Sequence, residues 1–192
     1  MPNERDTSAA NTAPDVVLDT CCLVNLAAID GTLECLAKFG LIWYVPTAVQ
    51  AEGIFIRIDT DSREVHRIDL AAVVSTGTVQ ICALAGEEEH GLYVEFALSL
   101  DDGEAMALAI AKNRRWRLAT DDRKARSKAQ TVGVTVLTTP ELVQRWAATT
   151  GYSEAQIADA LRRIETLARF APADDSDAAH WWRKIVVENP AT

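Results

Sequence analysis

Acidic residues at four separated places in this 192-residue sequence are the side chains best suited to chemistry. The motifs are VVLD, VPTAVQAE, LDDGEAMALAIA and RLATDDRKAR, and they contain Asp19, Glu52, Glu104 and Asp122. Carboxylates that met at one point could not all stay ionised without a counter-ion. A hard divalent cation, Mg²⁺ or Mn²⁺, would neutralise them and leave coordination positions for phosphate and water. The four acids together therefore suggest metal-dependent phosphodiester hydrolysis.

Three of these motifs also have a purely structural explanation. Asp19 can cap the helix that follows it, and capping is the slightly better explanation when this residue is taken alone. Asp101 and Glu104 match a capping box, which for Glu104 by itself outweighs catalysis. Of Asp121 and Asp122, one is expected as an N-cap while the other is left for another task. Only the four sites taken together favour a metal centre.

The elements that must position these acids alternate between strand and helix. Apolar and β-branched runs predict strands at 16–18, 41–45, 78–82, 116–120 and 132–137, and helical patterns fall after or between them, including 68–74, 86–98, 101–112 and 123–130. Such alternation predicts a mainly parallel sheet with helices on both faces and ligands at the carboxyl ends of the strands. Asp19, Asp122 and the start of the Glu104 helix would then share one edge.

The segment after the second strand is expected to be helical. Pro46 suits the first turn of a helix, which either ends at Gly53 or continues through Ile58. If Gly53 ends it, the charge of Glu52 opposes the helix macrodipole by about 0.3 to 1 kcal/mol. If the helix continues, that cost disappears.

The two ends of the chain differ from its middle. Residues 1–14 lack periodicity and predict a disordered tail, whereas 139–148 and 153–170 read as helices. The last twenty or so residues carry Trp181 and Trp182 among acids, which predicts a mobile linker and a sticky terminal segment. The domain prediction is a tail at 1–14, an α/β domain at 15–148 and a helical C-terminal extension with its tail at 149–192.

The net charge of −9 would repel nucleic acid on average, so contact with RNA needs local basic patches. The candidates nearest the acids are Arg114, Arg115, Arg117, Arg123, Lys124, Arg126 and Lys128. The acidic triplet 87–89 is expected at the surface, with the alternative that one of its members extends the acidic pocket. The three histidines, His66, His90 and His180, are also expected at the surface.

Composition also bears on the compartment. No apolar run approaches the roughly 20 residues of a membrane span, and the N-terminus has no signal-like stretch. The four cysteines include an adjacent pair and no CxxC spacing, so reduced, mostly buried thiols are expected. These features predict a soluble cytoplasmic protein without a membrane partner.

In order and spacing, the four motifs resemble those of the PIN-domain nucleases, the family that includes the VapC-type toxins of bacterial type II toxin–antitoxin pairs. The resemblance runs from Val16 to Trp146. It implies an α/β/α sandwich that cleaves single-stranded RNA with a divalent metal. Asp19, Glu104 and Asp122 would hold that metal, with Glu52 in the outer part of the acidic pocket and Asp121 as an auxiliary ligand. Candidates for positioning the substrate are Asn25, Thr120, Arg123 and Arg126, although for Thr120 helix capping is the stronger explanation.

Two departures from the family qualify the transfer of function. Cys21 stands where the family often carries a small hydroxyl residue, and the chain from about Thr149 exceeds the usual domain. The predicted function is a Mg²⁺- or Mn²⁺-dependent endoribonuclease, with an antitoxin and a second copy of the chain as candidate protein partners. The alternative is a catalytically weak PIN-like binding or scaffold protein. A phosphatase or receiver-like domain fits poorly, because the first strand ends in a single Asp19 rather than a DxD pair.

Overall fold

A parallel sheet forms the centre of the computed structural model, which describes residues 15–52, 54–57, 64–173 and 175–190. Within these residues its five strands lie in the order β5-β2-β1-β6-β7 and every pair is parallel. Their bounds are Val16–Leu18 (β1), Trp43–Pro46 (β2), Val79–Cys82 (β5), Arg117–Ala119 (β6) and Val136–Leu137 (β7). The predicted tail at residues 1–14 lies outside the described residues.

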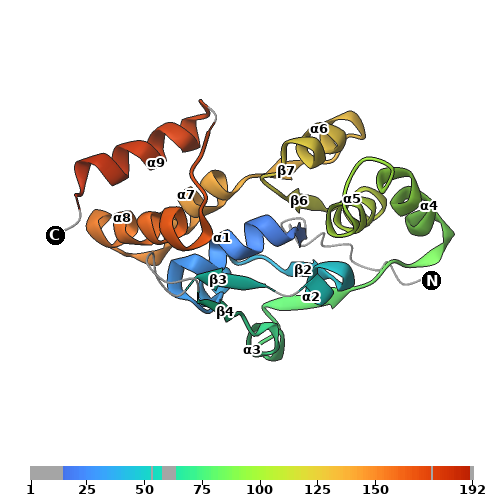
Figure 1. The fold of residues 1–192 in the computed structure, drawn as a ribbon, viewed down its shortest axis with the longest axis horizontal. Helices are drawn as coiled ribbons and strands as arrows, with labels where there is room; N and C mark the ends of the chain where they lie inside the picture. Colours follow the sequence, from blue (N-terminus) through green and yellow to red (C-terminus); the bar gives the residue numbers. More distant parts are fainter. Residues whose placement is uncertain (1–14, 53, 58–63, 174, 191–192) are drawn as a thin grey trace, which may run out of the picture.

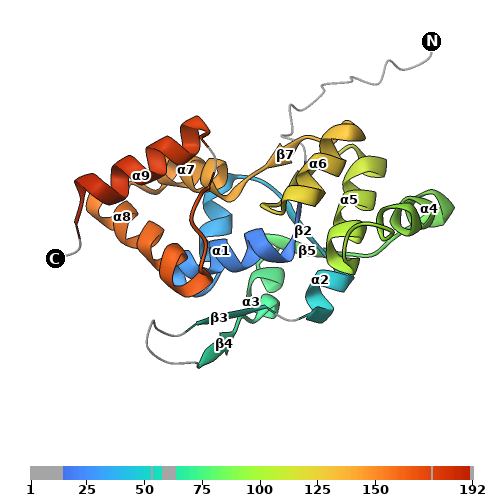
Figure 2. The same ribbon diagram turned by 45° about the horizontal axis from the view of Figure 1, so that its top comes forward.

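Helices cover both faces of this sheet (Figures 1 and 2). The central strand β1 is buried on both faces, with Val16 and Leu18 in one apolar cluster and Val17 in the other, because successive strand side chains alternate. One layer contains α1 (Thr20–Asp30), α7 (Thr139–Thr150) and α8 (Glu154–Arg163), and the other contains α4 (Gly86–Phe96), α5 (Asp102–Arg114) and α6 (Arg123–Thr131). The predicted three-layer α/β/α sandwich is therefore confirmed.

After β2, the helix stops at Glu52, in agreement with the alternative in which it ends at Gly53 and not with continuation through Ile58. Pro46 is the last residue of β2, and the helix that follows, α2 (Thr47–Glu52), is short. Next comes β3 (Phe55–Arg57), which pairs antiparallel with β4 (Val65–Arg67). Ile54 and Ile56 are buried and Phe55 is exposed, so the period here is two, and continuation of the helix was the wrong prediction. Gly53 and Ile58 themselves lie outside the described residues.

The terminal segment is a helix packed on the domain rather than the predicted sticky segment, and the described residues before it, 171–173 and 175–176, are not helical. Ser176 caps α9 (Asp177–Glu188), which lies beside α7 and α8 (Figure 1). Ala178, Trp182 and Ile185 are buried on one stripe with helical spacing. The Trp182 indole Nε1 donates to Glu165 Oε1 at 2.8 Å. The remaining short elements are a 3₁₀ helix (Glu34–Phe39), α3 (Leu70–Ser75) and a π-helical turn (Ile164–Ala168).

Other composition-based expectations can be compared directly. All four cysteines are free thiols, and Cys22, Cys35 and Cys82 are buried. The three histidines are exposed, as expected. In the part of the chain that the structure describes, none of the helices has the length and apolar character needed to span a membrane.

Candidate active site

Two adjacent strands and three helix starts bring the predicted acids to one edge of the sheet. Asp19 directly follows β1, and Asp122 follows β6 and begins α6. Because β1 and β6 are parallel neighbours, their carboxyl ends lie at the same edge. Glu104 lies in the first turn of α5, and the charges of Asp122, Asp19 and Asp101 all act on it. The three predicted metal ligands therefore share one electrostatic environment.

Asp19 both caps α1 and points into this environment. Its side chain is buried, and Oδ1 accepts from the Thr20 amide at 2.7 Å. Oδ2 accepts from Thr120 Oγ1 at 2.7 Å and from Cys21 Sγ at 3.2 Å. Burial raises the pKa of Asp19 above its ordinary value, and these hydrogen bonds only partly offset that effect. Capping and a role in the acidic site are thus compatible for this residue.

The predicted capping box at Glu104 is present, yet it does not account for the whole side chain. Asp101 Oδ1 accepts from the Glu104 amide at 2.8 Å, and Glu104 Oε2 accepts from the Asp101 amide at 3.3 Å. Burial and then the charge of Asp101, followed by those of Asp122 and Asp19, raise the pKa of Glu104 to about 7. Glu104 therefore lies where negative charge is concentrated and a cation would be stabilised.

The adjacent acids Asp121 and Asp122 have different tasks. Asp122 is the N-cap of α6, and its Oδ1 accepts from the amides of Lys124 and Ala125 at 2.7 and 2.9 Å. Asp121 uses both oxygens: Oδ1 accepts from the Thr139 amide at 2.9 Å, and Oδ2 accepts from the Thr139 hydroxyl and from Asn25 Nδ2. Asp121 therefore connects α1, α6 and α7. Because both of its oxygens already accept hydrogen bonds, the predicted role as an auxiliary metal ligand would require some of these bonds to break.

Asn25 belongs to this network and not to an open surface. It is buried, and its Nδ2 donates to Asp121 Oδ2 at 3.0 Å and to Thr139 Oγ1 at 3.1 Å. The predicted role for Asn25 in positioning substrate would therefore be indirect, through Asp121 and Thr139. Thr139 is fully buried and was not identified from the sequence, where its only signal was its place at the start of a helix.

Glu52 reaches the site through contacts that the sequence did not reveal. Thr20 Oγ1 donates to Glu52 Oε2 at 2.7 Å, which links the start of α1 to the end of α2. A Cβ added to Gly103 would lie 2.6 Å from Glu52 Oε1 and 3.3 Å from Val49 Cγ2. Glycine at position 103 therefore allows α5 to approach α2 closely. Glu52 lies against Gly103, the residue that precedes Glu104 in the sequence.

The donor atoms determine which ion each part of the site would suit. The Sγ atoms of Cys21 and Cys22 and an oxygen of Asp121 lie within 4.8 Å of one another, the closest such convergence of potential ligands among the described residues. Burial raises the pKa of Cys22 well above its ordinary value, and its thiol donates to Asp121 at 3.3 Å, so it serves as a neutral donor. Asp19, Glu104 and Asp122 do not form such a group among the described residues. The charges of Asp122 and Asp19 nevertheless act on Glu104, and the three side chains offer only oxygen, which fits a hard divalent cation.

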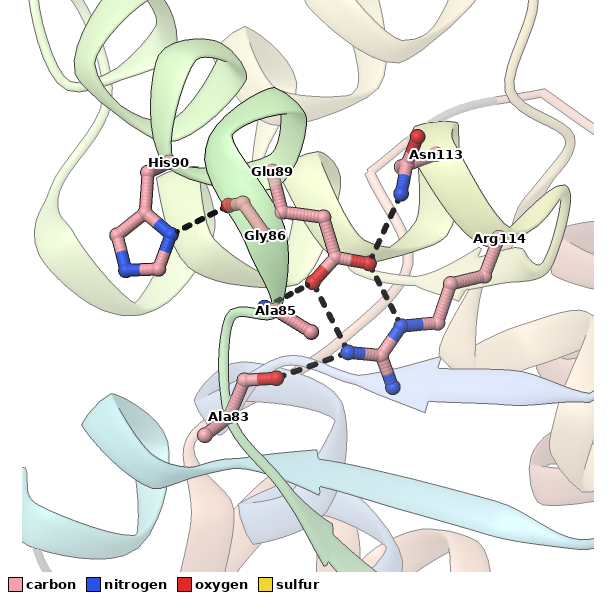
Figure 3. A network of polar contacts seen from close by, with 7 residues as sticks. All are labelled: Ala83, Ala85, Gly86, Glu89, His90, Asn113 and Arg114. Carbon is pink, nitrogen blue, oxygen red and sulfur yellow. Dashed lines mark hydrogen bonds and ion pairs between the residues drawn. The ribbon is translucent and has the colours of Figure 1, made fainter.

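The prediction that the acidic triplet is solvated holds for Glu87 and Glu88, which are exposed, and is wrong for Glu89. Glu89 is only 1% exposed, and it forms a two-pronged ion pair with Arg114 at 2.7 and 2.9 Å (Figure 3). Asn113 and the Ala85 amide also donate to Glu89. Burial acts to raise the pKa of Glu89, but these donors and the charge of Arg114 lower it overall. Arg114 is therefore engaged in the fold, which weakens its candidacy as an RNA contact.

Two of the other predicted cations lie next to the acids. Arg123 and Arg126 project from the first turns of α6 into a pocket that Asp121 also lines. Thr120 is fully buried, donates to Asp19 and accepts from the Asp122 amide at 3.2 Å. Its hydroxyl orients acids of the site, whereas the two arginines line the neighbouring pocket.

The family comparison agrees with this architecture. A family model described as a PIN domain matches residues 15–171, and the chain belongs to that family. PIN domains are generally nucleases and typically use divalent metal ions. A search of curated proteins gave no match. The family match includes α8, whose buried residues share the apolar cluster around α1, while the division of the chain at residue 148 stays a prediction.

Proposed function

We propose that this protein is a Mg²⁺- or Mn²⁺-dependent endoribonuclease that hydrolyses phosphodiester bonds of single-stranded RNA. The observation that carries the proposal is the concentration of carboxylates around Glu104, whose pKa is raised to about 7 by burial and by neighbouring acids. Acids in such a place favour binding of a cation, and an all-oxygen donor set suits these two ions. Membership of a family of nucleases supports the reaction class.

The residues of the chain would fix the geometry of the reaction. Asp19, Glu104 and Asp122 would hold the metal. Hydrogen bonds on one oxygen orient Glu104 and Asp122, and hydrogen bonds on both oxygens orient Asp19. Glu52, anchored by Thr20, would border the outer part of the pocket. When bound, a divalent cation neutralises these acids and makes a coordinated water a stronger nucleophile. This arrangement needs no nucleophilic side chain.

The test compares purified wild-type protein with Asp122→Asn on mixed single-stranded RNAs in Mn²⁺. Asparagine also caps helices well, so α6 should persist while the charge is lost. We expect cleavage to fall by about 100-fold or more, as losses of electrostatic transition-state stabilisation do. Asp159→Asn, on the exposed face of α8, serves as the matched control and should cleave like the wild type. Equal degradation by wild type and Asp122→Asn would indicate a contaminating ribonuclease and contradict the proposal.

A catalytically weak binding or scaffold protein is the second candidate, and Cys21 is the observation that favours it. A thiol, a weaker hydrogen-bond donor than a hydroxyl, contacts Asp19 Oδ2 and accepts from the Asp121 amide at 3.3 Å. RNA binding without metal-dependent turnover would select this candidate.

A role as the toxin of a type II toxin–antitoxin pair is the finer form of the proposed function. It implies a cytoplasmic location and an antitoxin that masks the acidic pocket, and it admits a homodimer. Co-expression with a small adjacent gene tests it: the antitoxin should co-purify with the protein and suppress its RNA cleavage. Sedimentation of the protein alone reports whether a homodimer forms.

A further inference from the structure

We propose that the pocket between α6 and residues 170–173 binds one nucleotide of the RNA chain beside the bond that is cleaved. This inference rests on the proposed function and specifies its substrate contacts. The pocket has a volume of about 370 Å³, within the range of small-molecule sites. Its lining includes Asp121, Arg123, Arg126, Thr138, Phe170 and Pro172.

Position is the first argument for this pocket. Two of its lining residues, Asp121 and Arg123, flank Asp122 in the sequence, and Asp122 is one of the three proposed metal ligands. Asp121 is also fixed by Thr139 and Asn25, so this wall of the pocket is rigid. A nucleotide held here would therefore place its neighbouring phosphodiester next to the acids.

Charge is the second argument. The nine residues of α6, RKARSKAQT, contain four cations and no acid, in a chain whose net charge is −9. Arg123 is exposed and makes no ion pair with any described residue. It also lines a second cleft, on another side of α6, together with Lys124 and Lys128. Lys128 is already paired with Glu95 at 2.9 Å, so Arg123, where the two clefts meet, and Lys124 are the cations offered to a phosphate backbone beside the acids.

The third argument is an aromatic wall that the fold holds in place. Phe170 is half-buried, and its ring packs edge-on against Trp182 with centroids 6.0 Å apart. Arg183 Nη2 donates to the carbonyl of Pro172 at 3.3 Å and so holds the residues that follow Phe170 in the pocket wall. Single-stranded RNA is typically recognised by stacking of splayed bases on aromatic rings, with cations along the backbone. A pocket with both features fits a nucleotide better than an apolar peptide.

The experiment measures binding of a fluorescein-labelled ten-nucleotide single-stranded RNA by anisotropy in EDTA, and cleavage of the same RNA in Mn²⁺. Phe170→Leu removes the aromatic face but keeps apolar volume against Trp182, and we expect about 10-fold weaker binding. Arg123→Gln should weaken binding about 5-fold and reduce the salt dependence by about one phosphate contact. Arg67→Gln, an exposed arginine on β4, makes the same charge change elsewhere and should bind like the wild type. Melting temperatures verify that each variant is folded.

The outcomes separate this inference from the proposed function. In one outcome the wild type cleaves RNA, and Phe170→Leu and Arg123→Gln bind and cleave RNA as well as the control Arg67→Gln does. This outcome refutes the nucleotide site and leaves the proposed nuclease function intact. If binding depends on Phe170 and Arg123 but Mn²⁺ produces no cleavage, the site stands and the nuclease fails. Absence of RNA binding, or equal Phe170-dependent binding of double-stranded RNA, would also overturn the site, because a paired base cannot stack on the ring.

Discussion

Glu89 and Glu104 are the same chemical group in opposite electrostatic situations. Glu89 is buried against Arg114, and its pKa is lowered. Glu104 lies among Asp101, Asp122 and Asp19, and its pKa is raised to about 7. For Glu89, which holds α4 and α5 together, the protein supplies the cation from its own chain. Glu104 is surrounded by like charge, and there a cation from solution is proposed to bind.

The largest expected effect on stability comes from breaking the ion pair between Glu89 and Arg114. Arg114→Met keeps apolar contact with the Trp116 ring but leaves Glu89 buried without its counter-charge. We expect the free energy of unfolding to fall by about 3 kcal/mol, measured by urea denaturation. The exposed pair Lys184–Glu188 provides the control, since Lys184→Met should cost no more than about 0.5 kcal/mol. Equal losses in the two variants would show that the burial of Glu89 does not matter.

Addition of metal should have the next largest effect on stability, through the proposed site of Asp19, Glu104 and Asp122. Mn²⁺ at 100 times its dissociation constant should stabilise the wild type by about 2.7 kcal/mol, because binding to the folded state shifts the unfolding equilibrium. Asp122→Asn should respond much less, while Lys184→Met should respond like the wild type. An unchanged melting temperature of the wild type at millimolar Mn²⁺ would contradict a metal site among these acids.

The pH dependence of stability should have opposite signs for the two glutamates. The pKa of Glu104 is about 7 in the folded state against 4.5 for an ordinary glutamate, so its stabilising contribution is complete below about pH 4.5 and is lost as pH rises through 7. The pKa of Glu89 is lowered, so its contribution is present above pH 4.5 and lost on acidification. Metal-free urea denaturation between pH 4.5 and 8 should show that Glu104→Gln loses less stability than the wild type over this interval. Parallel curves would contradict the electrostatic account of Glu104.

The smallest expected effect concerns Cys21, at the border of the acidic region. Serine can replace the thiol as donor to Asp19 Oδ2 and as acceptor from the Asp121 amide. Cys21→Ser should therefore change the free energy of unfolding by less than about 1 kcal/mol and preserve cleavage, whereas Cys21→Ala should destabilise more. Urea denaturation and RNA cleavage measure both effects. A larger loss in the serine variant than in the alanine variant would show that hydrogen bonding is not the task of Cys21.

Local sequence patterns predicted much of the fold because local physics governs them. The capping box of Asp101 and Glu104 and the N-cap Ser153 are formed by residues within one turn of a helix. The strand at 16–18 was recognisable because its apolar run is buried on both faces. Prediction failed at 54–57, where a strand of three residues is too short to show its period, and in α9, where the helical stripe lies next to acids and Pro residues.

The candidate site also combines features that the sequence determined with features that only the tertiary structure decided. The sequence by itself determined which acids stand at the ends of strands and the starts of helices, because backbone periodicity and capping depend on near neighbours. Only the tertiary structure decided which acids acquire partners. Asp121 is engaged by Asn25, 96 residues away, and Glu89 by Arg114, 25 residues away, whereas Glu104 is surrounded by like charge. A carboxylate's pKa and hydrogen bonds depend on burial and on groups brought close in space, and no local pattern specifies these.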